Sequence, residues 1–183
     1  PFELTTFRAD CGIKDGRHPQ SVSFVRDIVS DLSRRDFTVN AMAWSPEKGL
    51  VDPFGGREDI TKRLIRCVGE PSLRFEEDAL RILRSLRFMS RLGFRLDDET
   101  AKALRQNAFR LKTISRERIF SELSGIICGK NACDTVTEYA DVISVALPEL
   151  FAGGAFMLKR LPDELHLRFV ALFKNADDAE NGM

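Results

Sequence analysis

Apolar and polar positions alternate along the first part of the chain, a pattern that is typical of short strands. Residues 2–7 are β-branched and aromatic without a breaker, so we expect a strand there. Its period of two places Glu3 and Thr5 on the same face. A weaker alternation over residues 21–25 predicts a second strand, and the stretch 10–20, rich in Gly, Asp, Arg and Pro, predicts a loop.

The next stretch mixes helical and extended signals. Residues 27–43 are predicted to be mostly helical, with a break near Arg35. Residues 50–56 predict a short strand and then a tight turn, because the Gly-Gly pair in Asp-Pro-Phe-Gly-Gly allows positive φ. That turn favours a structural role over a catalytic one. A brief helix over 58–62 and an extended piece over 65–68 follow.

After Pro71 the apolar positions repeat with helical spacing. A strong helix is predicted over residues 74–91, whose apolar members fall within about 120° of one another on a helical wheel: Ala79, Ile82, Leu83, Leu86 and Met89. Further helices are predicted over 97–107, 115–128, 132–139 and 162–175. The chain is therefore expected to be α+β, with a mixed front over 1–69 and an all-helical back over 70–183.

Composition narrows the class of protein. The 183 residues are 43% hydrophobic and 31% charged, enough to bury a core, and no apolar stretch is long enough to span a membrane. No signal peptide is visible, and the chain opens on Pro1, so we expect part of a longer protein. Four cysteines and two histidines without zinc-ligand spacing favour reduced thiols in the cytosol over a structural metal.

The net charge is zero, but it is unevenly distributed. Residues 57–91 and 92–130 each carry +3, whereas 131–183 carry −5 and 1–56 carry −1. A polyanion would therefore be met by the middle of the chain. A solvated surface of mixed charge explains the same numbers, and on charge alone it is the favoured interpretation.

Charged residues on the predicted helix over 74–91 suggest a specific chemistry. Arg81, Arg84 and Arg87 follow one another at spacings of three, and Asp78 lies one turn before them. A carboxylate beside a guanidinium offers acceptors and donors that match the edge of a base, and the following arginines suit a triphosphate. An exposed helix with an ordinary ion pair between Asp78 and Arg81 is an equally good explanation of this helix taken alone.

Two further candidates lie in the front. Arg34 to Ala41 form a short run with two arginines, an acid, a hydroxyl and an amide, and its members Arg35, Asp36 and Asn40 offer the cations and acceptors that a ribose triphosphate needs. Taken alone, a helix start with a charged cap is the favoured explanation of this run. Glu3, on its strand, has the chemistry of a Mg²⁺ ligand, although most such residues simply face solvent.

Several motifs occur together and in order. They are Glu3-Leu-Thr-Thr-Phe-Arg, Arg17-His-Pro, Arg34-Arg-Asp-Phe-Thr-Val-Asn-Ala, Asp52-Pro-Phe-Gly-Gly and Arg74-Phe-Glu-Glu-Asp-Ala-Leu-Arg. With this series the chain resembles the bacterial (class II) CCA-adding tRNA nucleotidyltransferases and the related poly(A) polymerases. The resemblance covers about residues 2–128. It implies a partial nucleotidyltransferase head followed by a helical neck and the start of a body.

The resemblance also implies roles. The family adds CMP and AMP to tRNA 3′ ends from CTP and ATP, with Mg²⁺ held by carboxylates. Glu3 matches the third carboxylate of that metal centre, and residues 114–118 resemble a motif that braces the neck. The implied nucleotide contacts are Arg35 for the nucleotide, Asp36 and Asn40 near the ribose, Asp78 and Arg81 for the base, and Arg84 and Arg87 as further contacts.

The departures from the family pattern set limits. The Gly-Gly-x-x-Arg-Asp segment and the Asp-x-Asp pair of the family occur nowhere in the sequence, so we expect this chain alone to be inactive. Lys174-Asn175 stands where some relatives carry His-Asp, which argues against a metal site of that type. Poly(A) polymerase, CC-adding enzyme, A-adding enzyme and a non-catalytic RNA-binding module remain alternatives, and the sequence leaves the oligomeric state open.

Overall fold

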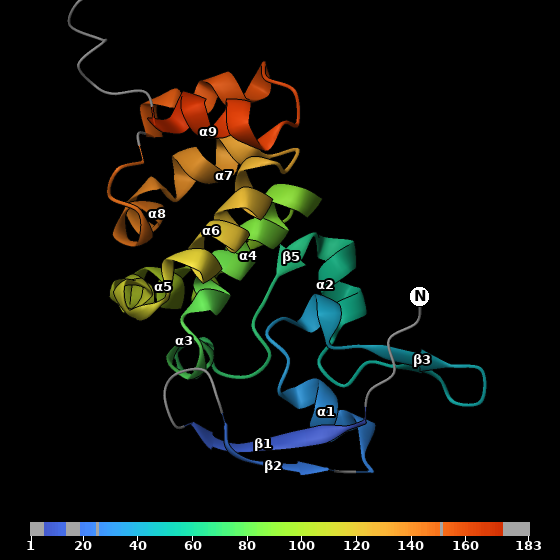
Figure 1. Cartoon of the computed structure of the whole chain (residues 1–183). Helices are drawn as coiled ribbons and strands as arrows, with labels where there is room; N and C mark the ends of the chain where they lie inside the picture. The colour runs from blue at the N-terminus through green and yellow to red at the C-terminus, as the bar shows by residue number, and fades with distance from the viewer. Residues whose placement is uncertain (1–5, 14–18, 25, 151, 174–183) are drawn as a thin grey trace, which may run out of the picture.

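The computed structural model describes residues 6–13, 19–24, 26–150 and 152–173 (Figure 1). Within these ranges, helices are accompanied by three pairs of short strands, and the expected α+β class is confirmed. The β1–β2 pair lies at one end of the molecule and α9 at the other (Figure 1). Most of the strand predicted over residues 2–7, including Glu3, lies outside the described residues.

The first strand pair is an antiparallel hairpin. β1 (Arg8–Ile13) pairs with β2 (Pro19–Phe24), with Arg8 opposite Phe24. The strand expected over residues 21–25 is confirmed through residue 24, but the expected loop over 10–20 is wrong for residues 10–13, which belong to β1, and for residues 19 and 20, which belong to β2. The Asp and Gly of that stretch are poor strand formers, yet pairing with a neighbouring strand overrides such local preferences.

The predicted break near Arg35 is confirmed. α1 (Ile28–Ser33) begins at Asp27, whose carboxylate accepts hydrogen bonds from the backbone N–H groups of Val29 at 3.2 Å and Ser30 at 2.9 Å. The helix stops at residue 33, and one short 3-10 turn, η1 (Thr38–Asn40), follows. The chain then becomes extended, so the helix expected up to residue 43 is wrong at its end.

A second hairpin and a capped helix complete the front. β3 (Ala43–Ser45) pairs antiparallel with β4 (Gly49–Val51). Asp52 then accepts hydrogen bonds from the N–H groups of Gly56 at 2.7 Å and Arg57 at 2.9 Å, and so starts α2 (Gly56–Lys62). A Cβ on Gly56 would lie 2.1 Å from the Thr38 carbonyl oxygen, so glycine is required where α2 packs on η1. The Gly-Gly turn therefore has the structural role expected of it.

The single helix predicted over residues 74–91 is two helices. α3 (Pro71–Glu77) and α4 (Leu80–Leu92) are separated at Asp78, whose φ of −151° and ψ of 105° are extended. The Asp78 carboxylate accepts a hydrogen bond from the Leu80 N–H at 3.0 Å, so this residue starts α4 as a capping group would. Periodicity missed the break because the apolar positions continue through it.

The remaining helices largely follow the sequence. α5 (Asp98–Asn107), α6 (Arg116–Ile127), α7 (Ala132–Glu138) and α9 (Leu165–Phe173) match predicted helices; η2 (Ala108–Thr113), α8 (Ala140–Ala146) and η3 (Ala152–Lys159) were not expected. The back is not all-helical, because β6 (Arg95–Leu96) pairs in parallel with β5 (Leu64–Ile65) of the front.

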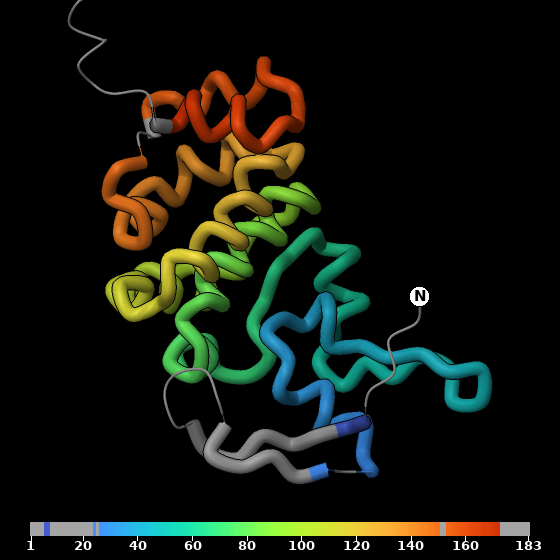
Figure 2. The backbone as a smooth tube through the Cα atoms, in the orientation of Figure 1, coloured from blue at the N-terminus to red at the C-terminus, as the bar shows by residue number. Residues whose placement is uncertain are grey.

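One hydrophobic core joins the front to the helices. Phe37 is fully buried and meets Phe88 edge-on, with ring centroids 5.6 Å apart. Its segment pairs with Cys67 in an isolated antiparallel bridge, and β5 lies beside α4 (Figure 1 and Figure 2). The division into domains at residue 69 stays a prediction, since this core continues across it. None of the helices in the described ranges is both long and apolar enough to cross a bilayer.

Truncating Phe37 is expected to destabilise the fold strongly. Phe37→Ala would leave a cavity where the front meets α4, and we expect the free energy of unfolding to fall by about 3–5 kcal/mol in chemical denaturation. Phe156→Ala is the matched control, because Phe156 is 61% exposed. Similar losses in the two variants would contradict the placement of Phe37.

The buried thiol of Cys67 predicts that the fold loses stability at alkaline pH. Burial raises the pKa of its thiol from 9.0 to about 12, so between these values the folded chain keeps a proton that the unfolded chain has lost. Stability is then expected to fall as pH rises from 9 to 12, by at most about 1.4 kcal/mol per pH unit. Cys67→Ala should make the stability decline less steep in denaturant titrations, whereas the buried control Val68→Ala should not. An unchanged slope in Cys67→Ala would refute this assignment.

Candidate functional site

A polar pocket opens where the segment after α1 faces the start of α4. Its volume is about 390 Å³. Five of its lining residues are arginines and two are carboxylates, so the lining is cationic. The lining residues are Arg34, Arg35, Asp36, Asn40, Asp78, Leu80, Arg81, Arg84 and Arg118.

Hydrogen bonds hold the segment after α1 in place. On the inner side the Thr38 N–H donates to the Arg66 carbonyl at 2.9 Å, and the Val68 N–H donates to the Asp36 carbonyl at 3.0 Å. Asn40 donates to the Asp36 carboxylate at 2.7 Å. These bonds turn the Asp36 side chain toward α4 while the neighbouring Phe37 enters the core.

An ion pair joins this segment to α4. Arg84 Nε donates to Asp36 Oδ2 at 2.6 Å, and the Asp36 side chain is 7% exposed. Burial by itself would lower the pKa of the Arg84 guanidinium, but nearby carboxylates, Asp36 first among them, raise that pKa above its usual value. Arg84 therefore stays charged at the pocket wall.

Asp78 is bound by a residue from another helix. Arg118 Nη2, on α6, lies 2.8 Å from Asp78 Oδ2 and 3.2 Å from Oδ1. Both side chains are 22% exposed. The break between α3 and α4 thus turns a carboxylate into the pocket, and α6 fixes its orientation.

Arg81 is also held, though by other partners. Its Nη1 donates to the Arg74 carbonyl at 3.1 Å and to Glu77 Oε2 at 2.5 Å, and its Nη2 donates to the Arg34 carbonyl at 3.4 Å. The ion pair between Asp78 and Arg81 that the sequence allowed as an ordinary explanation is therefore replaced by two separate pairs. Both groups still line the same pocket.

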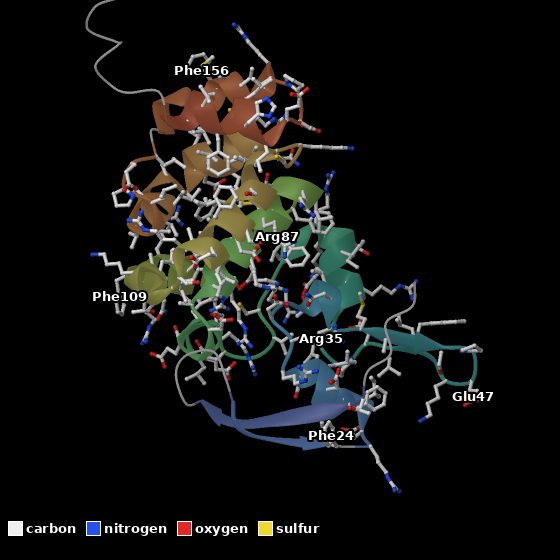
Figure 3. The ribbon with its side chains drawn as sticks, viewed as in Figure 1. Phe24, Arg35, Glu47, Arg87, Phe109 and Phe156 are labelled. Carbon is white, nitrogen blue, oxygen red and sulfur yellow. The ribbon has the colours of Figure 1, made fainter. Side chains whose placement is uncertain are left out.

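Six of the eight predicted site residues come together here: Arg35, Asp36, Asn40, Asp78, Arg81 and Arg84. Arg87 lies about a turn beyond Arg84, outside the lining set, and its Nε donates to Glu122 Oε2 at 2.6 Å. It also packs on Gly125, where a Cβ would lie 2.3 Å from Arg87 Cδ. Figure 3 shows Arg35 by α1 and Arg87 farther along, beside α4 and α6. Glu3 lies outside the described residues.

Two further charged residues line the pocket beyond the contacts that the resemblance implies. For Arg118 the sequence predicts a bracing role in the helical part, and nothing in its local pattern points to Asp78, forty residues earlier. Arg34 belongs to the predicted run of cations and acceptors over residues 34–41, and its place in the pocket agrees with that run. Its guanidinium pairs with Asp31 of α1, with Nη2 at 2.6 Å from Oδ1.

The arrangement suits an anionic ligand with a polar ring. Guanidinium groups bind phosphate oxygens through paired N–H donors, and carboxylates accept hydrogen bonds from amino and hydroxyl groups. Within the described ranges, no group of three or more His, Cys, Asp or Glu side chains is placed to hold a metal ion. The described part of the chain therefore offers a nucleotide-sized polar pocket, and the residues present in it do not form a metal centre.

Family models match two stretches of the chain. Residues 1–66 match the poly(A) polymerase head domain, and residues 93–150 match the model described as a probable RNA- and SrmB-binding site of polymerase A. The pocket is built from the first stretch, from the second, and from Asp78 and α4 between them.

Individual relatives agree with these models. The CCA-adding enzyme of Geobacillus thermodenitrificans is 46% identical over 157 residues, which are 85% of this chain and 39% of that protein. The crystal structure of the Bacillus stearothermophilus CCA-adding enzyme in complex with CTP matches with a TM-score of 0.72 at 43% identity, over 85% of this chain and 37% of the other.

A third match is the Thermotoga maritima CCA-adding enzyme complexed with tRNA, with a TM-score of 0.68 at 29% identity over 84% of this chain and 43% of the other. The chain thus spans about two fifths of the length of these relatives. The two family models and these relatives agree, and the chain belongs to the family of CCA-adding tRNA nucleotidyltransferases and poly(A) polymerases.

Proposed function

We propose that this chain carries the nucleotide-selecting part of an enzyme that adds CMP and AMP to the 3′ ends of tRNA, using CTP and ATP. The observation that carries the proposal is the single pocket in which residues from α4, from α6 and from the segment after α1 converge. The named activity of the relatives, and the CTP and tRNA bound to two of them, support it.

Asp78 and Arg81 would choose the base. The Asp78 carboxylate has about four acceptor positions, and within the described residues Oδ2 receives one bond, from Arg118. Arg81 has five N–H donors, of which three are engaged by protein oxygens in the same part of the chain. An acceptor and two donors are thus left to face the pocket.

That set of groups is complementary to two bases. Cytosine and adenine present an amino group beside a ring nitrogen that accepts, so they satisfy the Asp78 acceptor and an Arg81 donor together. Uracil and guanine present a carbonyl and an N–H at the corresponding positions, and would oppose acceptor to acceptor and donor to donor. The protein itself would thus take the place of a complementary base.

The other pocket residues would hold the sugar and phosphates. Arg35 and Arg84 would supply guanidinium donors for the triphosphate, and Asp36 and Asn40, which line the same pocket, would form hydrogen bonds with the ribose hydroxyls. Arg87, bound to Glu122, would act on the nucleotide only through the position of α4. The roles of all these residues are part of the proposal.

Mg²⁺ enters the proposal through the family relationship and through Glu3. When bound, such ions activate the attacking hydroxyl and stabilise the leaving pyrophosphate. Among the described residues there is no cluster of His, Cys, Asp or Glu side chains that could hold such an ion. The cytosol, where tRNA and nucleoside triphosphates are available, is the proposed location.

The first test is the product that the complete protein makes from CTP and ATP. With tRNAs that end before, within and after CCA, we expect two CMP and one AMP to be added in order, and addition to stop there. A long A tail would indicate a poly(A) polymerase, and addition of C alone or A alone would indicate the corresponding partial activity. Binding without any addition would indicate an RNA-binding module and overturn the proposal.

The second test concerns base choice. In the complete protein Asp78→Ala is expected to reduce discrimination in favour of CTP and ATP about tenfold or more, because the acceptor that meets the amino group is lost. The measurement is kcat/KM for all four nucleoside triphosphates. Glu58→Gln, which removes an exposed carboxylate paired with Lys62, should leave the ratios unchanged. Unchanged ratios in Asp78→Ala would refute the templating role.

A further inference from the structure

Asp31 is a buried carboxylate that contacts two arginines of the pocket but does not itself line the pocket. The Asp31 side chain, on α1, is 5% exposed, and it touches the two adjacent arginines that do line the pocket. Arg34 and Arg35 follow Asp31 by three and four residues, which brings both side chains to its face of the helix end. Asp31 has no part in the proposed activity.

The two arginines are held differently. Arg34 donates to Asp31 Oδ1 through Nε at 3.1 Å and through Nη2 at 2.6 Å, a fork on one oxygen. Arg35 reaches Asp31 Oδ2 with one nitrogen at 3.5 Å. Their side chains are 24% and 44% exposed. Arg34 is therefore clamped, while Arg35 is held loosely at the edge of the pocket.

A hydrogen bond also connects Arg34 to Arg81, which is proposed to select the base. The backbone carbonyl of Arg34 accepts a hydrogen bond from Arg81 Nη2 at 3.4 Å. Fixing the end of α1 therefore also fixes one oxygen against which Arg81 is oriented. Through these contacts Asp31 reaches three pocket arginines from outside the pocket.

We propose that Asp31 is a positioning residue that aims the guanidinium groups of Arg34 and Arg35 at the polyphosphate of a nucleoside triphosphate. This inference rests on the proposed function, because it assumes that the pocket binds such a ligand. A free arginine side chain loses rotamer freedom when it binds a phosphate; a carboxylate that has already ordered the side chain removes part of that cost.

Charge alone makes the opposite prediction. A carboxylate close to a phosphate site repels the ligand, so neutralising it should tighten binding of a polyanion if electrostatics were its only effect. If Asp31 acts by orienting the arginines, neutralising it weakens binding although the pocket becomes more positive. The sign of the change separates the two effects.

The experiment measures binding of CTP and CMP to the 183-residue chain by calorimetry, without divalent metal. For Asp31→Asn we expect the Kd for CTP to rise about tenfold and the Kd for CMP to rise less, because CMP has fewer phosphates to meet the arginines. Asp31→Glu, which keeps the carboxylate, should recover part of the loss. Asp27→Asn removes one negative charge from the exposed start of the same helix and should change neither constant.

The outcomes are distinct. If Asp31→Asn binds CTP as tightly as the wild type or more tightly, the positioning role is wrong and the proposed function stands. If the wild-type chain binds no CTP, the proposed function fails and this inference falls with it. Should Asp31→Asn not fold, as judged by circular dichroism, Arg34→Lys takes its place. It keeps the charge without the fork, and unchanged selectivity for CTP over CMP in that variant would overturn the proposal.

Discussion

The pocket depends on the ion pair between Asp36 and Arg84, which joins two parts of the chain 48 residues apart at 2.6 Å. Phe37, next to Asp36, enters the shared core, so one peptide unit delivers a charge to the pocket wall and an aromatic ring to the interior. A carboxylate this buried is tolerable only with a charged partner. The segment after α1 can therefore separate from α4 only by exposing both the ring and the charges.

Each arginine of the pocket that would meet a ligand is backed by protein oxygens. Glu77 holds Arg81, Asp36 holds Arg84, and Asp31 holds Arg34. These acids moderate the repulsion among cations that converge on a small volume, and they fix the direction of donors that remain open. The site is thus arranged before a ligand arrives, which is the condition for a protein surface to discriminate between bases that differ in one donor and one acceptor.

Local sequence signals account for much of this fold. The apolar stripe of α4 and the acidic start of α5 have the periods and end charges that helices require, and the structure confirms both. The predictions that were wrong concern contacts between distant segments, or a break in a helix that the apolar periodicity does not reveal. The strand pairing of β5 with β6 depends on chain segments thirty residues apart, and the break at Asp78 leaves the helical period intact. For the site, motif resemblance found six members of the pocket, whereas Arg118 could not be found because only the packing of α6 on α4 brings it to Asp78.

Gly125 couples the spacing of two helices to the geometry of the pocket. A Cβ there would lie 2.3 Å from Arg87 Cδ, so the Arg87 side chain of α4 packs on α6 where a glycine leaves room for it. Arg118 lies about two turns earlier on the same helix, and any outward shift of α6 would pull its guanidinium away from Asp78. The base selection proposed for this pocket would consequently depend on a residue that does not line the pocket, through the distance between α4 and α6.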